Sequence, residues 1–182
     1  MSRIPTPTFE DAPAAAQPLL AQVQQQLGSV PNLFRIVANS PAALEAYLGF
    51  SGALRKGALA APTRERIALA VAEVNGCDYC LSAHTYLARN FAKLDDAEIT
   101  ANRNGASKDL TAGAAVRFAA QLARSRGQVG QADIDAVKDA GYSDAEIVEI
   151  IAHVALNVFT NTINEALGTE IDFPRVAARS NA

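Results

Sequence analysis

The sequence ERIALAVAEVNGCDYCLSAH, residues 65–84, decides both the fold and the chemistry expected of this chain. Its Ile67–Val74 segment is apolar on nearly every side, which is typical of a helix buried in a protein core. The Asn75-Gly76 pair that follows is a turn signal, and a second helix is expected from about Cys77 to Phe91. The stretch therefore predicts two consecutive helices joined by a turn, with a cysteine pair where the second helix begins.

The cysteine pair has the properties of a redox site. Cys77, Cys80 and His84 fall on one face of an α-helix, and the chain has only two cysteines and two histidines. The partial positive charge at a helix N-terminus stabilises a thiolate, which is the reactive form of cysteine. A spacing of three residues lets two sulfurs close an easily reduced disulfide. His84 can accept or return a proton near neutral pH.

Other uses of the pair are weaker alternatives. Cys77, Cys80 and His84 supply three zinc ligands, but a fourth would have to come from His153 or a carboxylate. Haem attachment requires a histidine directly after the second cysteine, where Leu81 stands. An inert pair of buried thiols is also open. We expect redox chemistry, with neither a metal nor a cofactor.

Composition limits the class of protein. The chain has 182 residues, of which 49% are hydrophobic and 19% charged, as in soluble globular domains. A net charge of -3 gives no basic surface for nucleic acid or anionic lipid. Signal-peptide and membrane-spanning patterns are not found. We expect a cytoplasmic protein, and in a reducing compartment a close cysteine pair is more often catalytic or metal-binding than a permanent crosslink.

The rest of the chain reads as helical. It is rich in alanine, the best helix former, and has little strand-like alternation. Residues 1–10 contain Pro5 and Pro7, which favour an extended N-terminal arm. Residues 1–182 are therefore predicted to form a single all-α domain. Further helices are expected over Leu19–Leu27, Pro31–Val37, from Ser40-Pro41 to about Gly57, from Pro62, over Asp95–Asn102, after the cap Asp109, over Gln131–Ala140, and from Ser143 to Leu167.

The last helix has two faces. Ser143 and Glu146 form a capping box at its start. One face is apolar, and the other carries a polar stripe at spacings of three and four residues. We expect this stripe to be a solvated or subunit-facing surface. Its members are Glu149, His153, Asn157, Asn161 and Asn164.

The 65–84 stretch resembles the core of the alkyl hydroperoxidase D (AhpD) family of the carboxymuconolactone decarboxylase-like superfamily. That family's pattern is a glutamate, eleven residues, a CxxC pair, three residues and a histidine. Glu65, Cys77, Cys80 and His84 match it position for position. The whole chain also resembles the peroxidase-related branch. The resemblance implies an AhpD-like helical fold, with the CxxC at a helix N-terminus, that assembles as a trimer or hexamer.

The resemblance also implies a reaction. It implies a thiol peroxidase that reduces a hydroperoxide through a sulfenic acid and then a disulfide, regenerated by a dithiol donor. Cys80 would be the peroxidatic nucleophile, Cys77 the resolving thiol and His84 the proton shuttle, with Glu65 assisting. Helix position alone would favour Cys77 as the nucleophile. Glu73 lies outside the family pattern.

One residue departs from the family. Tyr79 stands between the cysteines, where characterised peroxidases of the family often have a histidine. A phenol with a pKa of about 10 cannot replace an imidazole as a base at neutral pH. A dithiol–disulfide oxidoreductase or redox sensor therefore stays open as an alternative, with a zinc-binding or lyase-type protein behind it. Tyr79 and Tyr86 could line a pocket or simply pack.

Overall fold

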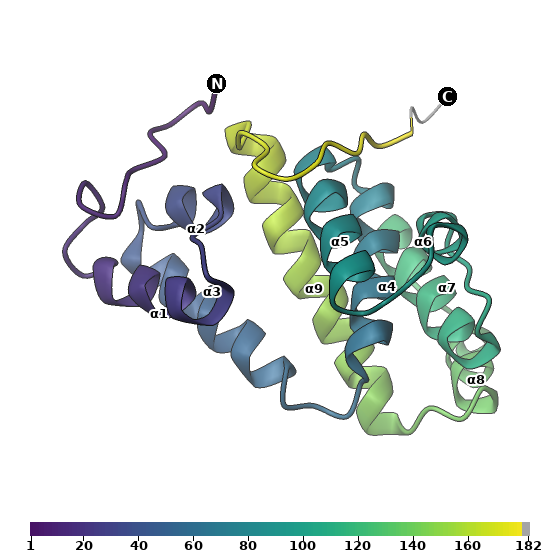
Figure 1. Cartoon of the computed structure of the whole chain (residues 1–182). Coiled ribbons are helices and arrows are strands. Elements are labelled where there is room, and N and C mark those ends of the chain that lie inside the picture. Colours follow the sequence, from purple (N-terminus) through teal and green to yellow (C-terminus); the bar gives the residue numbers. More distant parts are fainter. Residues whose placement is uncertain (180–182) are drawn as a thin grey trace.

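The structure is a computed structural model that describes residues 1–179, and within that range it contains nine helices and no strand. The predicted all-α class is confirmed. The helices, labelled in Figure 1, are α1 (Gln17–Leu27), α2 (Asn32–Val37), α3 (Pro41–Leu54), α4 (Ala61–Val74), α5 (Asp78–Asn90), α6 (Asp96–Arg103), α7 (Leu110–Ser125), α8 (Gln131–Asp139) and α9 (Asp144–Leu167).

Short polar side chains fix where several helices begin. Ser40, Asp95, Asp109 and Ser143 each accept a hydrogen bond from the backbone N–H three residues ahead. These bonds satisfy donors that the first turn of a helix leaves free. Ser143 also forms the predicted capping box with Glu146. Local sequence therefore sets these boundaries before any tertiary packing is considered.

Helix α4 is the centre of the fold. It contacts α5, α6, α7 and α9, and its residues 67–72 are at most 2% exposed, as the apolar Ile67–Val74 segment predicts. In Figure 1, α1, α2 and α3 lie on one side of α9, and α4 to α8 lie on the other. One buried cluster joins α1, α2 and α3 to α5, and a second joins α4 to α7, α8 and α9. The CxxC segment at the start of α5 belongs to the first cluster.

The long helix α9 is apolar enough to resemble a membrane-spanning segment by length and composition. In this fold it packs against α3, α4, α5 and α7.

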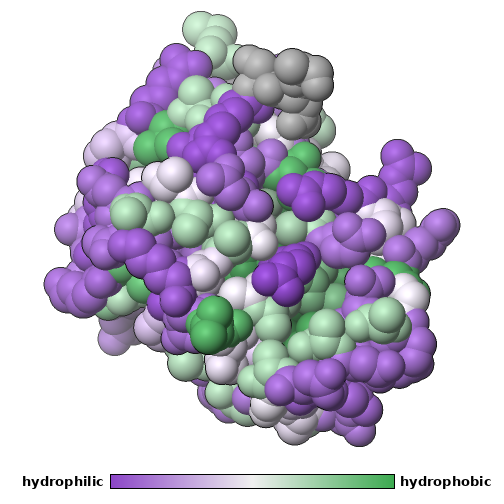
Figure 2. Space-filling model, turned by 90° about the vertical axis from the view of Figure 1, so that its right-hand side faces the viewer, coloured by the Kyte–Doolittle hydropathy of each residue, from purple (hydrophilic) through white to green (hydrophobic). Residues whose placement is uncertain are grey.

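The face on the right of Figure 1, where α6, α7 and α8 lie, mixes hydrophilic and hydrophobic residues in Figure 2.

The C-terminal segment 169–179 crosses the first turns of α5 (Figure 1). Val176 donates its backbone N–H to Ser82 Oγ at 2.9 Å, and Ala178 donates to Asp78 Oδ1 at 2.8 Å. At the other end of the chain, Arg3 donates to the backbone oxygens of Glu165 and Ala166 at the end of α9. The N-terminal arm and the segment 169–179 are thus fastened to α9 and α5, the helices that carry the polar residues described next.

Candidate active site

Cys77 lies immediately before α5 and caps it. Its backbone is extended, with φ −89° and ψ 98°, and its Sγ accepts a hydrogen bond from the backbone N–H of Cys80 at 3.3 Å. The preceding Gly76 has φ 68°, a left-handed conformation that glycine adopts without strain. The turn therefore brings the Cys77 sulfur back over the first turn of the helix, beside Cys80.

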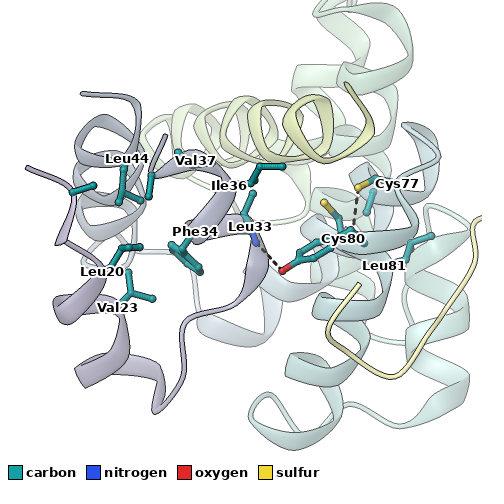
Figure 3. Close-up of a cluster of buried hydrophobic side chains, with 14 of the residues drawn as sticks. Leu20, Val23, Leu33, Phe34, Ile36, Val37, Leu44, Cys77, Cys80 and Leu81 are labelled. Carbon is teal, nitrogen blue, oxygen red and sulfur yellow. Dashed lines mark hydrogen bonds between the residues drawn. The ribbon is translucent and has the colours of Figure 1, made fainter. Parts of the chain in front are cut away.

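The two thiols are free and almost completely buried. Cys77 is 0% exposed and Cys80 is 3% exposed. In Figure 3 their sulfur atoms lie close together at the start of α5. The hydrogen bond from Cys77 lowers the pKa of the Cys80 thiol to about 7, against the opposing effect of burial, and the charge of His84 lowers it further. The same interaction, together with burial, raises the pKa of Cys77. Cys80 is therefore the cysteine held as a thiolate near neutral pH.

Glu65 and His84 form an ion pair beside the thiols. His84 Nδ1 lies 2.9 Å from Glu65 Oε2, and each side chain is 23% exposed. Burial alone would lower the pKa of His84, but the Glu65 carboxylate outweighs it, so the pKa is raised. The imidazole therefore retains its proton more readily than an isolated histidine. Within residues 1–179, no three His, Cys, Asp or Glu side chains converge as a metal site would require.

Two amides from α9 complete the surroundings of the Cys80 sulfur. Asn164 Nδ2 donates to Cys80 Sγ at 3.2 Å. Asn161 lies one turn earlier, and its Oδ1 accepts a hydrogen bond from Asn75 Nδ2 at 2.8 Å. Both amides help to lower the pKa of Cys80, after the contributions of Cys77 and His84. The sulfur thus faces hydrogen-bond donors from α5 and α9.

The expectation that the polar stripe of α9 faces solvent or another subunit is wrong. Its members from His153 onward are at most 6% exposed. Burial is tolerable because each of the three amides makes at least one hydrogen bond, as buried polar groups require. Asn157 Nδ2, for example, donates to the His153 backbone oxygen at 2.8 Å. The missed signal is that the stripe carries no carboxylate, lysine or arginine after Glu149. A solvated helix face normally carries such charges.

Tyr79 and Glu73 have fastening contacts. The Tyr79 hydroxyl donates to Asp172 Oδ1 at 2.8 Å and accepts from the Leu33 backbone N–H at 3.0 Å. Burial raises the pKa of this phenol, so it is no base at neutral pH. Glu73 pairs with Arg103 at 2.5 Å. Tyr79 joins α5 to α2 and the C-terminal segment, and Glu73 joins α4 to α6.

Tyr47 borders the site, although its sequence pattern did not identify it as a site residue. Tyr47 of α3 lies between Phe34 and Phe159, with ring centroids 5.6 and 5.8 Å away. Burial first, and then the negative charge of Cys80, raise the pKa of Tyr47 to about 12. Tyr86, by contrast, is 40% exposed and packs against Phe91 and Phe173.

Comparison with known proteins places this geometry in context. The model of the carboxymuconolactone decarboxylase family matches residues 41–125, which include all four residues of the predicted motif. No curated protein sequence matches the chain.

Several solved structures have the same fold. One is a peroxidase-related protein with an alkylhydroperoxidase AhpD core from Ralstonia eutropha JMP134, with 27% identity, a TM-score of 0.83, and coverage of 94% of this chain and 92% of that one. Another is a peroxidase-related protein from Silicibacter sp. TM1040, with 25% identity, a TM-score of 0.80, and coverage of 93% and 91%. The debrominase Bmp8 shares the fold at 22% identity, with a TM-score of 0.76 and coverage of 94% and 91%.

Proposed function

Since this chain is an AhpD-like member of the carboxymuconolactone decarboxylase superfamily, we propose that it is an enzyme that reduces hydroperoxides with its cysteine pair. One observation carries the proposal. Cys80 is a buried thiol whose pKa is lowered to about 7, with a second thiol beside it and a Glu65–His84 pair one turn away. These are the parts that a two-cysteine peroxidase needs.

The first step oxidises Cys80. Its thiolate attacks the terminal oxygen of the hydroperoxide, so an S–O bond forms as the O–O bond breaks. The sulfur becomes a sulfenic acid, and the peroxide is reduced to an alkoxide. His84, with its pKa raised by Glu65, supplies the proton that converts the alkoxide to an alcohol. The Glu65 carboxylate stabilises the protonated imidazole until that transfer.

The second step closes a disulfide. The sulfur of Cys77 attacks the Cys80 sulfur, an S–S bond forms and the S–O bond breaks. The departing hydroxide combines with the Cys77 proton as water. Cys77 is already held over the first turn of α5 by its bond to the Cys80 N–H, so little movement is required. A reducing dithiol from another molecule then restores both thiols by exchange.

Single-turnover chemistry tests this assignment. The reduced protein is mixed with one equivalent of cumene hydroperoxide, and the alcohol product and the protein mass are measured. We expect one equivalent of alcohol and the loss of two hydrogens from the peptide that holds Cys77 and Cys80. In Cys77→Ser a sulfenic acid should be trapped at Cys80. A pair that stays reduced, or that proceeds directly to sulfonic acid, contradicts the proposal.

A second candidate is a dithiol–disulfide oxidoreductase without efficient peroxidase turnover. Tyr79, the residue between the two cysteines in the sequence, favours this candidate. Its hydroxyl is hydrogen-bonded to Asp172 and to the Leu33 backbone, so it cannot act as a base for the thiols. Turnover of a disulfide substrate that is much faster than turnover of any hydroperoxide would select this alternative.

We also propose that the protein is cytoplasmic and acts as a homo-oligomer, a trimer or a hexamer. The support for assembly is a line of exposed apolar side chains along α9, joined by Phe50 of α3. These side chains are Val148, Ile151, Val158 and Phe159, each 37 to 64% exposed. Patches of this kind mark contacts between proteins. Sedimentation of a 19.1 kDa monomer at micromolar concentration would refute assembly.

A further inference from the structure

Two polar atoms beside the Cys80 sulfur have no hydrogen-bond partner. They are Nδ2 of Asn161, which lies close enough to Cys80 to help lower the pKa of its thiol but makes no hydrogen bond to the sulfur, and Oδ1 of Asn164. The two residues are 1% and 3% exposed, so water outside the protein does not reach them. Buried polar groups nearly always have partners, and leaving them without one is costly. Four other buried atoms within residues 1–179, on Thr85, Asn102, His153 and Thr169, also lack a partner, so it is the position of this pair at the reactive sulfur that indicates a place kept for a ligand.

The other end of each amide fixes which atom is free. Asn161 Oδ1 accepts from Asn75 Nδ2 at 2.8 Å, so the NH₂ group of Asn161 is left over. Asn164 Nδ2 donates to Cys80 Sγ at 3.2 Å, so the carbonyl oxygen of Asn164 is left over. The residues are three positions apart on α9 and share one face. Together they offer one donor and one acceptor next to the sulfur.

We propose that Asn161 and Asn164 form the subsite that binds the terminal hydroxyl of a hydroperoxide, an inference that rests on the proposed function. That hydroxyl is both an acceptor and a donor. Its oxygen accepts from Asn161 Nδ2, and its hydrogen donates to Asn164 Oδ1. One group satisfies both free atoms, which neither an ether oxygen nor an apolar group could do.

The subsite keeps its contacts through the reaction. When the Cys80 thiolate attacks the bound oxygen, the S–O bond forms and the O–O bond breaks. The hydrogen of the terminal hydroxyl stays on its oxygen, which becomes the sulfenic acid hydroxyl. The alkoxide that leaves takes its proton from His84. The two amides therefore hold the same O–H group before and after transfer, without reorganising.

The exposure of the site sets the direction of approach. Glu65 and His84 are each 23% exposed, whereas Cys77, Cys80 and the two asparagines are at most 3% exposed. A hydroperoxide that enters past Glu65 and His84 reaches the sulfur with its O–OH end first. Its organic group then lies toward solvent, and its leaving oxygen lies on the side of the protonated histidine.

The test compares two reactions of the same thiol. Asn161→Leu keeps the branched shape of the side chain in a somewhat larger volume, and it removes both the Nδ2 donor and the Oδ1 acceptor that bonds Asn75. The matched control is Asn157→Leu, the same change one turn earlier on the same buried stripe. For each protein, oxidation of Cys80 by a hydroperoxide and its alkylation by iodoacetamide are both timed, and the ratio of the two rates is taken. Alkylation needs the thiolate but not the hydroxyl subsite.

We expect the oxidation-to-alkylation ratio to fall roughly tenfold to 100-fold in Asn161→Leu, as loss of a hydrogen bond to a reacting group does. In Asn157→Leu the oxidation-to-alkylation ratio should stay at the wild-type value. The loss should be equal for hydrogen peroxide and cumene hydroperoxide, because the subsite binds only the group they share. Asn161→Ala serves as a second variant if Asn161→Leu does not fold by circular dichroism.

Two results would overturn the subsite in different ways. A wild-type protein that oxidises readily, with the same ratio in the Asn161 variants or an equal fall in Asn157→Leu, overturns the subsite alone. A wild-type Cys80 that alkylates but does not react with either hydroperoxide overturns the proposed function, and the subsite with it.

Discussion

Neighbouring residues of α4 lead to two polar clusters with opposite characters. Glu65 points to His84 and the thiols, and Arg66 points to Glu98 of α6. Four donors converge on the Glu98 carboxylate: Arg66 Nε at 2.7 Å, Asn102 Nδ2 at 2.9 Å, Ser107 Oγ at 2.5 Å and the Lys108 backbone N–H at 2.8 Å. In that cluster the carboxylate is saturated, and the atom left without a partner is Asn102 Oδ1. Around Cys80, by contrast, both a donor and an acceptor beside the reactive sulfur are left without partners.

The contrast separates fastening from chemistry. A carboxylate that the protein saturates cannot bind anything else, and it holds α4, α6 and the start of α7 together. Glu65 keeps a single hydrogen-bond partner and is partly exposed. A site that must accept a substrate cannot be saturated in advance. The predictions below break each cluster in turn, from the largest expected effect to the smallest.

The nucleophile itself should give the largest effect. Cys80→Ser replaces the thiolate by a hydroxyl, so we expect the single-turnover reaction with hydroperoxide to be lost, by at least about 10³-fold. Cys77→Ser should still oxidise once and stop at the sulfenic acid. The rate of hydroperoxide consumption at pH 7 measures both. Oxidation that survives in Cys80→Ser and fails in Cys77→Ser would exchange the two roles.

The ion pair beside the thiols should come next. His84→Ala removes the proton donor, and a general acid or base is worth about 10²–10⁴-fold in rate. Glu65→Gln should slow the same step by less, because it removes only the charge that raises the pKa of His84. Single-turnover oxidation from pH 5 to 9 measures these rates.

Glu73→Gln is the matched carboxylate control for Glu65→Gln. Glu73 lies on the same helix but pairs with Arg103, away from the thiols. Its replacement should leave oxidation nearly unchanged. If Glu73→Gln is crippling and Glu65→Gln is silent, the family-based assignment is wrong at that position.

The fold could be predicted from the sequence because the residues that determine its helices act on their near neighbours in the chain. The cap residues Ser40 and Ser143 mark helix starts through bonds that reach only three residues ahead. The apolar run in α4 predicts a central helix without information from the rest of the chain. The four motif residues also lie together, since Glu65 and His84 occupy adjacent helices joined by a short turn.

The site residues contributed by α9 and α3 could not be predicted from the sequence, for a physical reason. Asn161 and Asn164 reach Cys80 across more than 80 residues of chain, and only tertiary packing decides which face of α9 is buried. A helical stripe of asparagines has the same period whether water or a sulfur atom faces it. Tyr47 was missed in the same way, because its position depends on how α3 packs against α9.

Breaking the Glu98 cluster should cost stability but no chemistry. Glu98→Gln leaves Arg66 buried without its counter-charge, and we expect a loss of about 2–3 kcal/mol in the free energy of unfolding. Chemical denaturation at pH 7 measures this loss. The initial rate of Cys80 oxidation should stay within about twofold of the wild-type rate. A large loss of rate without a loss of stability would refute the division between the two clusters.

The pH dependence of the same variant sharpens the test. Burial would raise the pKa of Glu98, but the four donors outweigh it and lower the pKa to about 2. The folded pKa is therefore below the unfolded value, so this contribution to stability is complete above about pH 4.5. It is lost as the pH falls toward 2. The free energy of unfolding of Glu98→Gln should lack this part of its dependence on pH. If that free energy falls as steeply between about pH 4.5 and pH 2 in Glu98→Gln as in the wild-type protein, the prediction is contradicted.

The smallest effect concerns the amide on the sulfur. Asn164→Ala removes the donor to Cys80 Sγ, so the pKa of Cys80 should rise from about 7. At pH 6, where the thiolate is the minor form, alkylation by iodoacetamide should slow by up to roughly tenfold. At pH 9, where both proteins are largely thiolate, the rates should converge, because the donor changes how much thiolate forms. Peptide mapping assigns the label to Cys80, and Glu98→Gln should reproduce the wild-type profile. A profile unchanged in Asn164→Ala would mean that Cys77 and His84 alone hold the thiolate, and that the buried amides of α9 act on the peroxide rather than on the sulfur.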